Sequence, residues 1–418
     1  MKIGIISREY PPLTHVGGIA TFSAACASLL TLHGHEVHVV CNGLETKRET
    51  LSGITVHRVK MIEHHFKKGK WFFPIRKWYR KHLPHYLEAL TWARTVERYL
   101  TTHLDPGEFD LFEYPETGGE GAFFPKRILS SSGRSIHHHP KLVARIHTGW
   151  MDSLANNKLE KFLILRLQRI SCNRADRLVS PSRYMADTYL SQTLRVKKKV
   201  TVNHNPITFW EKPIDWENKK LVHLLFVGRI EHRKGLQVLL NALTEMGQDA
   251  NSIKLRVVGH LHHPTGQLDR DCQVNFEKTL KIKSANPDHG FALEYAGPGD
   301  HSDMPKHYDW AGILVLPSLM ENYPYVALEG LSRGCYLVGS QIGGIPEIID
   351  RASRGILFES ENSTQLAGKI RECICRDREI SENARDIVEQ IRSEFSPEAC
   401  YIRLMEVYGA DFTKEGQE

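Results

Sequence analysis

The chain has 418 residues, of which 41% are hydrophobic and 25% are charged. This composition is typical of a folded globular protein and excludes a disordered or fibrous chain, while the length predicts two domains. The formal net charge of +6 is not confined to one tail, so on its own it is a weak indication of an anionic partner.

The sequence has few features that indicate a cellular location. The eight cysteines contain no C-x-x-C pair, so we expect reduced thiols in a cytoplasmic protein. The first residues, MKIGIISREYPP, have the pattern of a strand and a turn and not of a signal peptide. No apolar run reaches 18 residues, so the sequence predicts no membrane span.

Short apolar runs alternate with longer amphipathic stretches over the first 205 residues. Strands are predicted at residues 2–7, 36–43, 54–59, 110–115, 142–147 and 177–182. Helical patterns lie between several of them, such as residues 19–34, which Gly34 closes. This alternation predicts a parallel, doubly wound sheet.

The pattern pauses in the polar, proline-bearing stretch 203–220 and then starts again. Further strands are predicted at residues 224–230, 255–261, 293–298, 312–318, 336–340 and 355–359. An amphipathic helix with charged residues ends the chain. We therefore predict an α/β protein of two Rossmann-like domains, residues 1–205 and 206–395, followed by a terminal segment at 396–418. Because ligands bind beyond the carboxyl ends of parallel strands, two such domains that face each other would form one cleft.

A glycine pair stands between the first strand and the first helix, in SREYPPLTHVGGIATFS. Gly17 and Gly18 would let backbone N–H groups approach an anion at a helix N-terminus, although a plain turn accounts equally well for them. The chain has neither G-x-G-x-x-G nor G-x-x-x-x-G-K-[ST], which disfavours a nicotinamide site, a kinase or an ATPase.

Two cations follow a buried strand in FVGRIEHRKG. Arg229 stands at the predicted strand end, and Lys234 precedes Gly235 and a helix. One rigid guanidinium and one flexible ammonium suit a diphosphate, whereas two solvated surface cations are the alternative.

A pair of glutamates follows another buried strand, in ENYPYVALEG. Glu321 lies on the turn, and Glu329 lies about two helical turns further on. Glu321 could accept hydrogen bonds from the hydroxyls of a bound group, and Glu329 from the paired hydroxyls of a ribose. Two carboxylates on one helix face are also common on protein surfaces, but their place after a buried strand favours a site.

Together, PSLMENYPYVALEG, VGRIEHRKG and GGIPEII (343–349) resemble the Glu-x7-Glu family of retaining glycosyltransferases with the GT-B fold, in glycosyl transferases group 1, family four. The resemblance extends from EYPPLTHVGGIATF to the terminal helix, which in this family crosses back onto the N-terminal domain.

The resemblance implies a set of donor contacts. Arg229 and Lys234 would hold the donor diphosphate, Glu329 the ribose and Glu321 the transferred sugar. The remaining donor contacts would come from backbone near Asn322, Tyr323, Pro324 and Tyr325, from Gly17 and Gly18, and from the segments that contain Gly259 and Pro298.

The same resemblance assigns a histidine at the end of an N-domain strand to the sugar. In VARIHTGW this residue is His147, which would steady the departing charge. His147, Glu321, Arg229 and Lys234 are thus the predicted catalytic residues. Glu113, in DLFEYPETGGEG, and Thr148 are predicted on the acceptor side.

The predicted chemistry is departure of a nucleoside diphosphate from an oxocarbenium-like sugar, with the two cations stabilising the leaving group. Retention is open between a covalent glycosyl-carboxylate and same-face attack with the donor phosphate as base; the family resemblance favours the second. A UDP-hexose is expected from base rates alone. The acceptor is expected to be a growing surface glycan, a lipid-linked sugar or a small metabolite.

We predict no cofactor and no metal requirement, because two cations already stand at the diphosphate. Asp269-x-Asp271 matches a metal motif of another glycosyltransferase fold but stands in a polar stretch, where a loop or a helix start is expected. Adjacent histidines, His137–His139, rarely converge on one ion.

Residues 60–82 contain eight Lys or Arg, one Glu and six aromatic side chains. Such a stretch is typical of an acceptor loop or of a segment that contacts an anionic membrane surface, here the inner face of the membrane. Nucleic acid is disfavoured because no recognition motif accompanies the basic residues. Oligomeric state is not predicted. Rival functions are a nucleotide-sugar sensor without activity and another GT-B enzyme such as a sugar-nucleotide epimerase.

Overall fold

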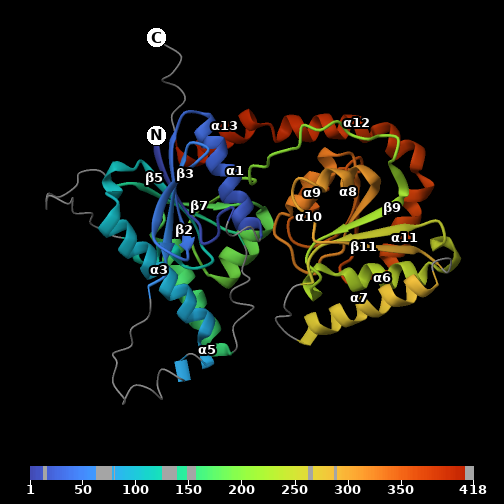
Figure 1. Cartoon of the computed structure of the whole chain (residues 1–418), viewed down its shortest axis with the longest axis horizontal. Helices are drawn as coiled ribbons and strands as arrows, with labels where there is room; N and C mark the ends of the chain where they lie inside the picture. Colours follow the sequence, from blue (N-terminus) through green and yellow to red (C-terminus); the bar gives the residue numbers. More distant parts are fainter. Residues whose placement is uncertain are drawn as a thin grey trace, which may run out of the picture. The chain divides into compact units, whose positions relative to one another are not determined.

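A computed structural model describes residues 1–12, 17–62, 78–79, 81–124, 139–147, 157–261, 267–286 and 290–409. The chain forms two compact units (Figure 1). Unit 1 contains residues 1–207 and the chain from Pro397 onward, and unit 2 is Thr208–Ser396. Each unit is an α/β domain with its own sheet, which confirms the predicted fold class.

Unit 1 is built on an eight-stranded sheet in the order β3-β4-β2-β1-β5-β6-β7-β8. All neighbours are parallel except β3, which pairs antiparallel with β4. The strands are β1 Lys2–Ile6, β2 Glu36–Gly43, β3 Lys47–Leu51, β4 Ile54–Lys60, β5 Leu111–Pro115, β6 Lys141–Arg145, β7 Arg177–Ser180 and β8 Val200–Val202.

Four long helices belong to unit 1 in its described part: α1 Gly18–Leu32, α3 Pro84–His103, α5 Lys158–Arg174 and α13 Pro397–Tyr408. The interior contains large side chains from strands and helices, such as Trp92, Phe112 and Tyr114.

Two strands were not predicted. β3 (KRETL) is polar and mostly exposed at the sheet edge, and β8 is only 3 residues long, so neither has the apolar run that marks a buried strand.

Unit 2 contains a six-stranded, fully parallel sheet in the order β11-β10-β9-β12-β13-β14. The strands are β9 Lys220–Val227, β10 Lys254–Val258, β11 Ala292–Gly297, β12 Ala311–Leu316, β13 Tyr336–Ser340 and β14 Gly355–Phe358. The helices are α6 Leu236–Glu245, α7 Gln267–Ala285, α8 Met304–Trp310, α9 Tyr325–Ser332, α10 Ile345–Ile348, α11 Ser363–Cys375 and α12 Asp377–Glu394. The direction of strand addition reverses between β9 and β12, and in such sheets ligands bind beside this point.

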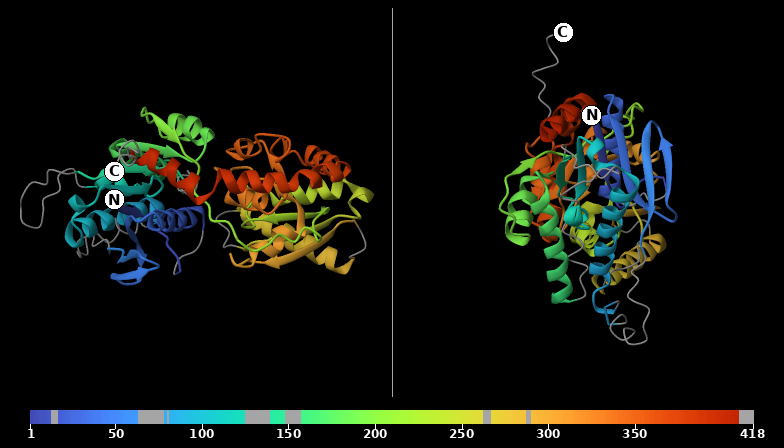
Figure 2. Two further views of the ribbon diagram at one scale, coloured as in Figure 1. Left: turned by 90° about the horizontal axis from the view of Figure 1, so that it is seen from above. Right: turned by 90° about the vertical axis from the view of Figure 1, so that its left-hand side faces the viewer.

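The terminal helix α13 belongs to unit 1, as predicted (Figure 2). The Tyr408 hydroxyl donates a hydrogen bond to Glu113 on β5, and the Asn203 amide donates to the Arg403 carbonyl at 2.9 Å. At the other end, the Tyr401 ring stacks on His33, with a centroid distance of 3.7 Å. Polar contacts thus fix α13 along its length.

The eight cysteines form no disulfide, and only Cys375 is exposed. No helix within the described ranges is long and apolar enough to cross a membrane.

Candidate functional site

The predicted donor residues of unit 2 lie at one edge of its sheet. Arg229 follows β9, Gly259 follows β10, Pro298 follows β11 and Glu321 follows β12. Because these strands are parallel, their carboxyl ends share this edge. The switch between β9 and β12 places the loop with Arg229 next to the turn with Glu321.

Close backbone packing joins these two loops. Gly235 has φ +70°, and a Cβ atom there would lie 1.8 Å from the Pro317 carbonyl oxygen. The Leu319 N–H donates to the Arg233 carbonyl at 2.8 Å. Glycine at position 235 therefore lets the loop before α6 pack directly on the chain leaving β12, which brings Lys234 to Glu321.

Lys234 and Glu321 form an ion pair, with Nζ 2.5 Å from Oε2. Their side chains are only 18% and 11% exposed, so the pair is largely shielded from water. Burial by itself would raise the pKa of Glu321, but Lys234, assisted by Arg233 and the Asn322 N–H, lowers it below its usual value. Glu321 is therefore an anion whose charge is balanced by the predicted diphosphate ligand Lys234.

Arg229 is held less tightly. Its guanidinium lies 3.3 Å from Glu231, and its side chain is 38% exposed. Glu231 also contacts Arg233, whose Nε lies 2.6 Å from its carboxylate. One carboxylate thus orients two arginines, and Arg229 keeps exposed surface with which it can contact an anion.

The turn that bears Glu321 is supported by the loop after β13. A Cβ atom at Gly343 would lie 1.9 Å from the Glu321 carbonyl oxygen, and the Gly344 N–H donates to the Asn322 carbonyl at 2.7 Å. The GGIPEII segment therefore packs directly against the backbone of this turn and supports it by a hydrogen bond. Beyond it, Pro324 precedes α9, which begins at Tyr325 as the sequence predicted, while Asn322 and Tyr323 are buried.

Glu329 lies on α9 and is held by a residue that sequence reasoning missed. The Tyr308 hydroxyl, on α8, donates to its Oε2 at 2.6 Å. Burial raises the pKa of Glu329, and the hydrogen bond from Tyr308 opposes that rise. Tyr308 lies in a helix outside the recognised motifs, so no local sequence signal marks it.

The loops after β10 and β11 are tied together. The Gly259 N–H donates to the Gly297 carbonyl at 2.9 Å, and the Tyr295 hydroxyl donates to the Gly259 carbonyl at 2.9 Å. Gly259 is partly buried, whereas Pro298 is exposed. These segments present backbone at the same sheet edge as Arg229.

In unit 1, Gly17 directly precedes α1, and Gly18 is its first residue. The Gly17 carbonyl accepts from the Thr21 N–H at 3.2 Å, so the glycine pair forms the start of the helix. The structure thus places both at a helix N-terminus, as the sequence predicted.

His147 follows β6 and is only 6% exposed. The backbone N–H of His147 donates to the Glu116 carboxylate at 2.8 Å, and its ring packs edge-on against Phe22. Burial, with a smaller effect of Arg145, lowers the pKa of His147 to about 3, so the imidazole is neutral near pH 7. Thr148 lies outside the described residues.

Two buried glutamates after β5 were not singled out from sequence. Burial raises the pKa of Glu116 to about 8 and that of Glu120 to about 7. Glu116 accepts from the His147 N–H, and Glu120 accepts from the Gly118 N–H at 3.0 Å. A carboxylate on each side of a Gly-Gly turn after a buried strand was the available signal. Their contacts show that they shape the loop next to His147.

Glu113 occupies a different environment from the one predicted. It is 1% exposed inside β5, where it pairs with Arg145 at 2.5 Å and accepts from the Tyr408 hydroxyl. Both carboxylate oxygens are therefore used inside unit 1. An internal anchor for α13 replaces the predicted acceptor-side role, because both faces of β5 are covered and all five of its residues are buried.

Asp269-x-Asp271 lies at a helix start, which is one of the two places that the sequence predicted for it. Asp269 lies in the first turn of α7 and accepts from the His232 N–H at 2.9 Å. No cluster of metal-binding side chains occurs within the ranges that the structure describes. His137 and His138 lie outside those ranges, as do residues 63–77 of the basic stretch.

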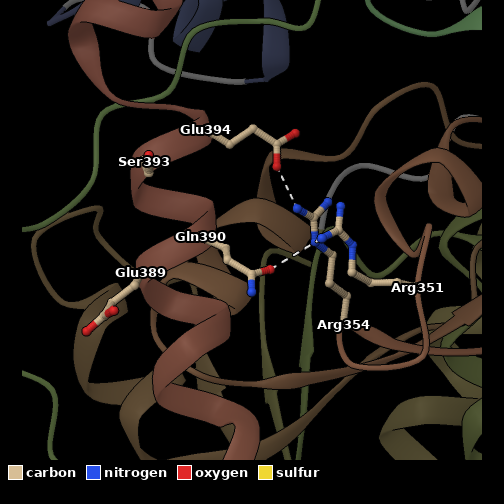
Figure 3. Close-up of a pocket in the computed structure, with 6 residues that line it drawn as sticks. All are labelled: Arg351, Arg354, Glu389, Gln390, Ser393 and Glu394. Carbon is tan, nitrogen blue, oxygen red and sulfur yellow. Dashed lines mark hydrogen bonds and ion pairs between the residues drawn. The ribbon is translucent and has the colours of Figure 1, made fainter.

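A surface pocket in unit 2 lies away from these residues. Arg351 and Arg354 face α12 there, and Arg354 pairs with Glu394 at 2.5 Å (Figure 3). Glu389, Gln390 and Ser393 of α12 complete the lining. Both of its cations have carboxylate partners, Arg351 with Asp350 and Arg354 with Asp350 and Glu394.

Comparison with known sequences identifies the class. The profile of the family described as Glycosyl transferases group 1 matches residues 208–393, and that of Glycosyltransferase Family 4 matches residues 16–209. Together they cover both units. The chain belongs to the glycosyl transferases of group 1, and it is a glycosyltransferase.

Individual relatives agree with this class. An uncharacterized glycosyltransferase of Methanocaldococcus jannaschii is 26% identical over 388 residues, which cover 88% of this chain and 87% of that protein. The catalytic domain of starch synthase IV from Arabidopsis thaliana, bound to ADP and acarbose, has a TM-score of 0.70 at 13% identity and covers 98% of both chains.

The Anabaena protein HepE in complex with UDP and glucose has a TM-score of 0.64 at 15% identity, covering 98% of this chain and 100% of that chain. At these identities the solved structures establish the fold, which is GT-B.

Proposed function

We propose that this glycosyltransferase moves a hexosyl group from a nucleotide-sugar donor with retention of the anomeric configuration, and that it requires no metal. The observation that carries the proposal is the partly buried Lys234–Glu321 ion pair, close in the chain to Arg229, at the switch point of the unit 2 sheet. In this proposal, Lys234 would bind the diphosphate and Glu321, its ion-pair partner, would bind the sugar hydroxyls.

The proposed role of Arg229 and Lys234 is to neutralise the diphosphate. Arg229 keeps exposed surface, and Lys234 is flexible enough to contact Glu321 and a phosphate oxygen together. As the anomeric bond breaks, charge grows on the leaving diphosphate, so each contact is worth about 3 kcal/mol in the transition state. Two resident cations would supply the charge that a metal ion supplies elsewhere.

The proposed roles of the glutamates differ because their environments differ. Glu321, ionised beside Lys234, would accept hydrogen bonds from hydroxyls of the transferred sugar. Glu329, oriented by the Tyr308 hydroxyl, would accept from the paired hydroxyls of the ribose. In unit 1, neutral His147 would donate a hydrogen bond to the sugar rather than carry a positive charge.

We propose same-face attack, in which a donor phosphate oxygen takes the acceptor proton while the diphosphate leaves. Retention then needs no carboxylate nucleophile, and Glu321, already paired with Lys234, is not required to act as one. UDP is the proposed nucleotide: HepE binds UDP and glucose, although starch synthase IV binds ADP. The acceptor class remains a glycan, a lipid-linked sugar or a small molecule.

The test measures calorimetric binding and nucleoside-diphosphate release across UDP-, GDP-, ADP- and dTDP-sugars in the presence of EDTA. We expect one donor to bind and to be slowly hydrolysed. Arg229→Ala and Glu329→Ala should weaken its binding, and Glu321→Ala should lower turnover about 100-fold.

Arg351→Ala, in the pocket of Figure 3, is the matched control and should bind donor normally. Normal nucleotide binding by both Arg229→Ala and Glu329→Ala would show that the site is wrongly assigned. Activity that returns only when Mg²⁺ replaces EDTA would overturn the metal-independent mechanism.

A further inference from the structure

Helix α5 presents an unusual outer face. Leu159, Phe162 and Ile170 are 49%, 59% and 40% exposed. With the exposed Arg166 they follow spacings of three and four residues, which align side chains along one side of a helix. The opposite side packs into unit 1 through Ile164, Leu167 and Cys172, so the outer face is fixed in place.

The charge on this helix is one-sided. Arg166 is exposed in line with the apolar side chains, while Lys158 and Lys161 are exposed on the flank of the first turn. The single acidic residue of α5, Glu160, is fully buried and accepts from the His85 and Tyr86 N–H groups at 2.8 and 3.2 Å. The exposed face of α5 is therefore apolar and cationic, and the acidic side chain of the helix lies on its buried side.

The end of the basic, aromatic stretch 60–82 lies against this helix. The Asn157 side chain caps α5 by accepting from the Glu160 N–H at 2.9 Å, and its amide donates to the His82 carbonyl at 2.7 Å. Nearby in the chain, Trp78 is 46% exposed and its ring contacts that of His82. Figure 1 shows α5 beside α3 on the outside of unit 1.

We propose that the outer face of α5, with Trp78, is a docking surface for an anionic lipid bilayer. Phe162, Leu159 and Trp78 would enter the headgroup region, while Lys158, Lys161 and Arg166 contact lipid phosphates. Charge complementarity favours this partner, because basic residues around an apolar strip attract anionic lipid and repel a cationic surface. The proposal concerns a different surface from the donor site and does not depend on the donor's identity.

The experiment uses flotation of the full chain with vesicles of phosphatidylcholine alone or of phosphatidylcholine mixed with phosphatidylglycerol. We expect binding to the mixed vesicles only, weakening as salt rises. Leu159→Ser with Phe162→Ser should reduce partitioning about tenfold. Replacing Lys158, Lys161 and Arg166 by Gln should reduce it about fivefold for each residue.

The matched control lies on α7 of unit 2, where Ile282 is 62% exposed and Lys281 is exposed. Ile282→Ser with Lys281→Gln should bind vesicles like the unchanged chain, and all variants should retain their melting temperature.

The proposal is overturned if the unchanged chain does not bind the mixed vesicles, or if folded α5 variants bind them as the unchanged chain does. It is also overturned if substitutions in residues 63–77 abolish binding while the α5 variants do not. If the α5 variants lose binding to duplex DNA that the unchanged chain shows, while their vesicle binding stays intact, the face would be assigned to nucleic acid instead.

Discussion

Lys234 and Glu321 are 87 residues apart in the chain and meet as a pair that is largely shielded from water. Removing one partner of such a pair leaves a poorly solvated charge without its nearest counter-ion, and this costs more than the pair itself contributes. Because Lys234 is also a proposed phosphate ligand, the pair links the stability of the empty site to donor binding.

Lys234→Ala should therefore destabilise unit 2 by about 2–3 kcal/mol at neutral pH. The lowered pKa of Glu321 contributes stability above the unfolded-state value, and this contribution is lost as pH falls through the folded-state pKa. Without Lys234, burial instead raises the pKa of Glu321, so the deficit of the variant should shrink as pH falls. Thermal unfolding of the unchanged chain and of Lys234→Ala between pH 8 and pH 4 measures this difference in stability.

The double variant Lys234→Ala/Glu321→Ala supplies the control. It removes both charges and should be more stable at neutral pH than Lys234→Ala alone. Equal stability of the two variants at every pH would mean that Glu321 is not held ionised by Lys234.

At the scale of elements, the proposed donor site is made by three loops that pack backbone against backbone. Glycines at 235 and 343 approach carbonyl oxygens of the chain that leaves β12, at distances no Cβ atom tolerates. The loops therefore hold one another in position before any ligand is present. Such preorganisation lowers the cost of ordering cationic side chains around a diphosphate.

Gly235→Ala should weaken nucleotide binding and lower the melting temperature. The left-handed backbone costs an alanine about 1 kcal/mol, and the contact with Pro317 forces the loop to move in addition. Gly247→Ala is the matched control, because Gly247 has φ +59° with nothing within 4 Å of its Cβ position. Equal effects of the two substitutions on nucleotide affinity would contradict the packing argument.

At the scale of the whole molecule, each unit has its own sheet and its own buried core, while the last helix belongs to the first unit. The buried triad of Glu113, Arg145 and Tyr408 joins α13 to β5 and β6. The Lys141 ammonium adds a bond to the Tyr408 carbonyl at 2.7 Å. Helix α13 is therefore part of the unit 1 core, although it follows unit 2 in the sequence.

Deleting residues 397–418 should destabilise unit 1 and leave unit 2 folded. Loss of Tyr408 exposes Glu113 and Arg145, whose burial depends on α13. Hydrogen exchange should speed up in β1, β5 and β6 but not in unit 2, and nucleotide affinity should change less than about twofold. Deleting only residues 410–418 is the control, and a similar loss there would contradict the assignment to α13.

Much of the fold could be predicted because buried parallel strands leave a local record. Apolar runs such as GILVLP mark β12, and their alternation with helical patterns indicates two doubly wound sheets. The same record places Arg229, Lys234 and Glu321 after strands, and strand ends are where such sheets bind ligands. For these residues, position along the chain already determines position in the sheet.

Contacts between distant segments left no such record. Glu113 was predicted on the acceptor side, yet its partners Arg145 and Tyr408 hold it inside unit 1. Tyr308, which orients Glu329, stands in no motif. The cationic outer face of α5 depends on Glu160 being buried against the start of α3. The sequence by itself determined the strands, the helices and the order of the cationic and acidic motifs. Only the tertiary structure decided which charges are buried, because the burial of a charge depends on partners that sequence proximity does not reveal.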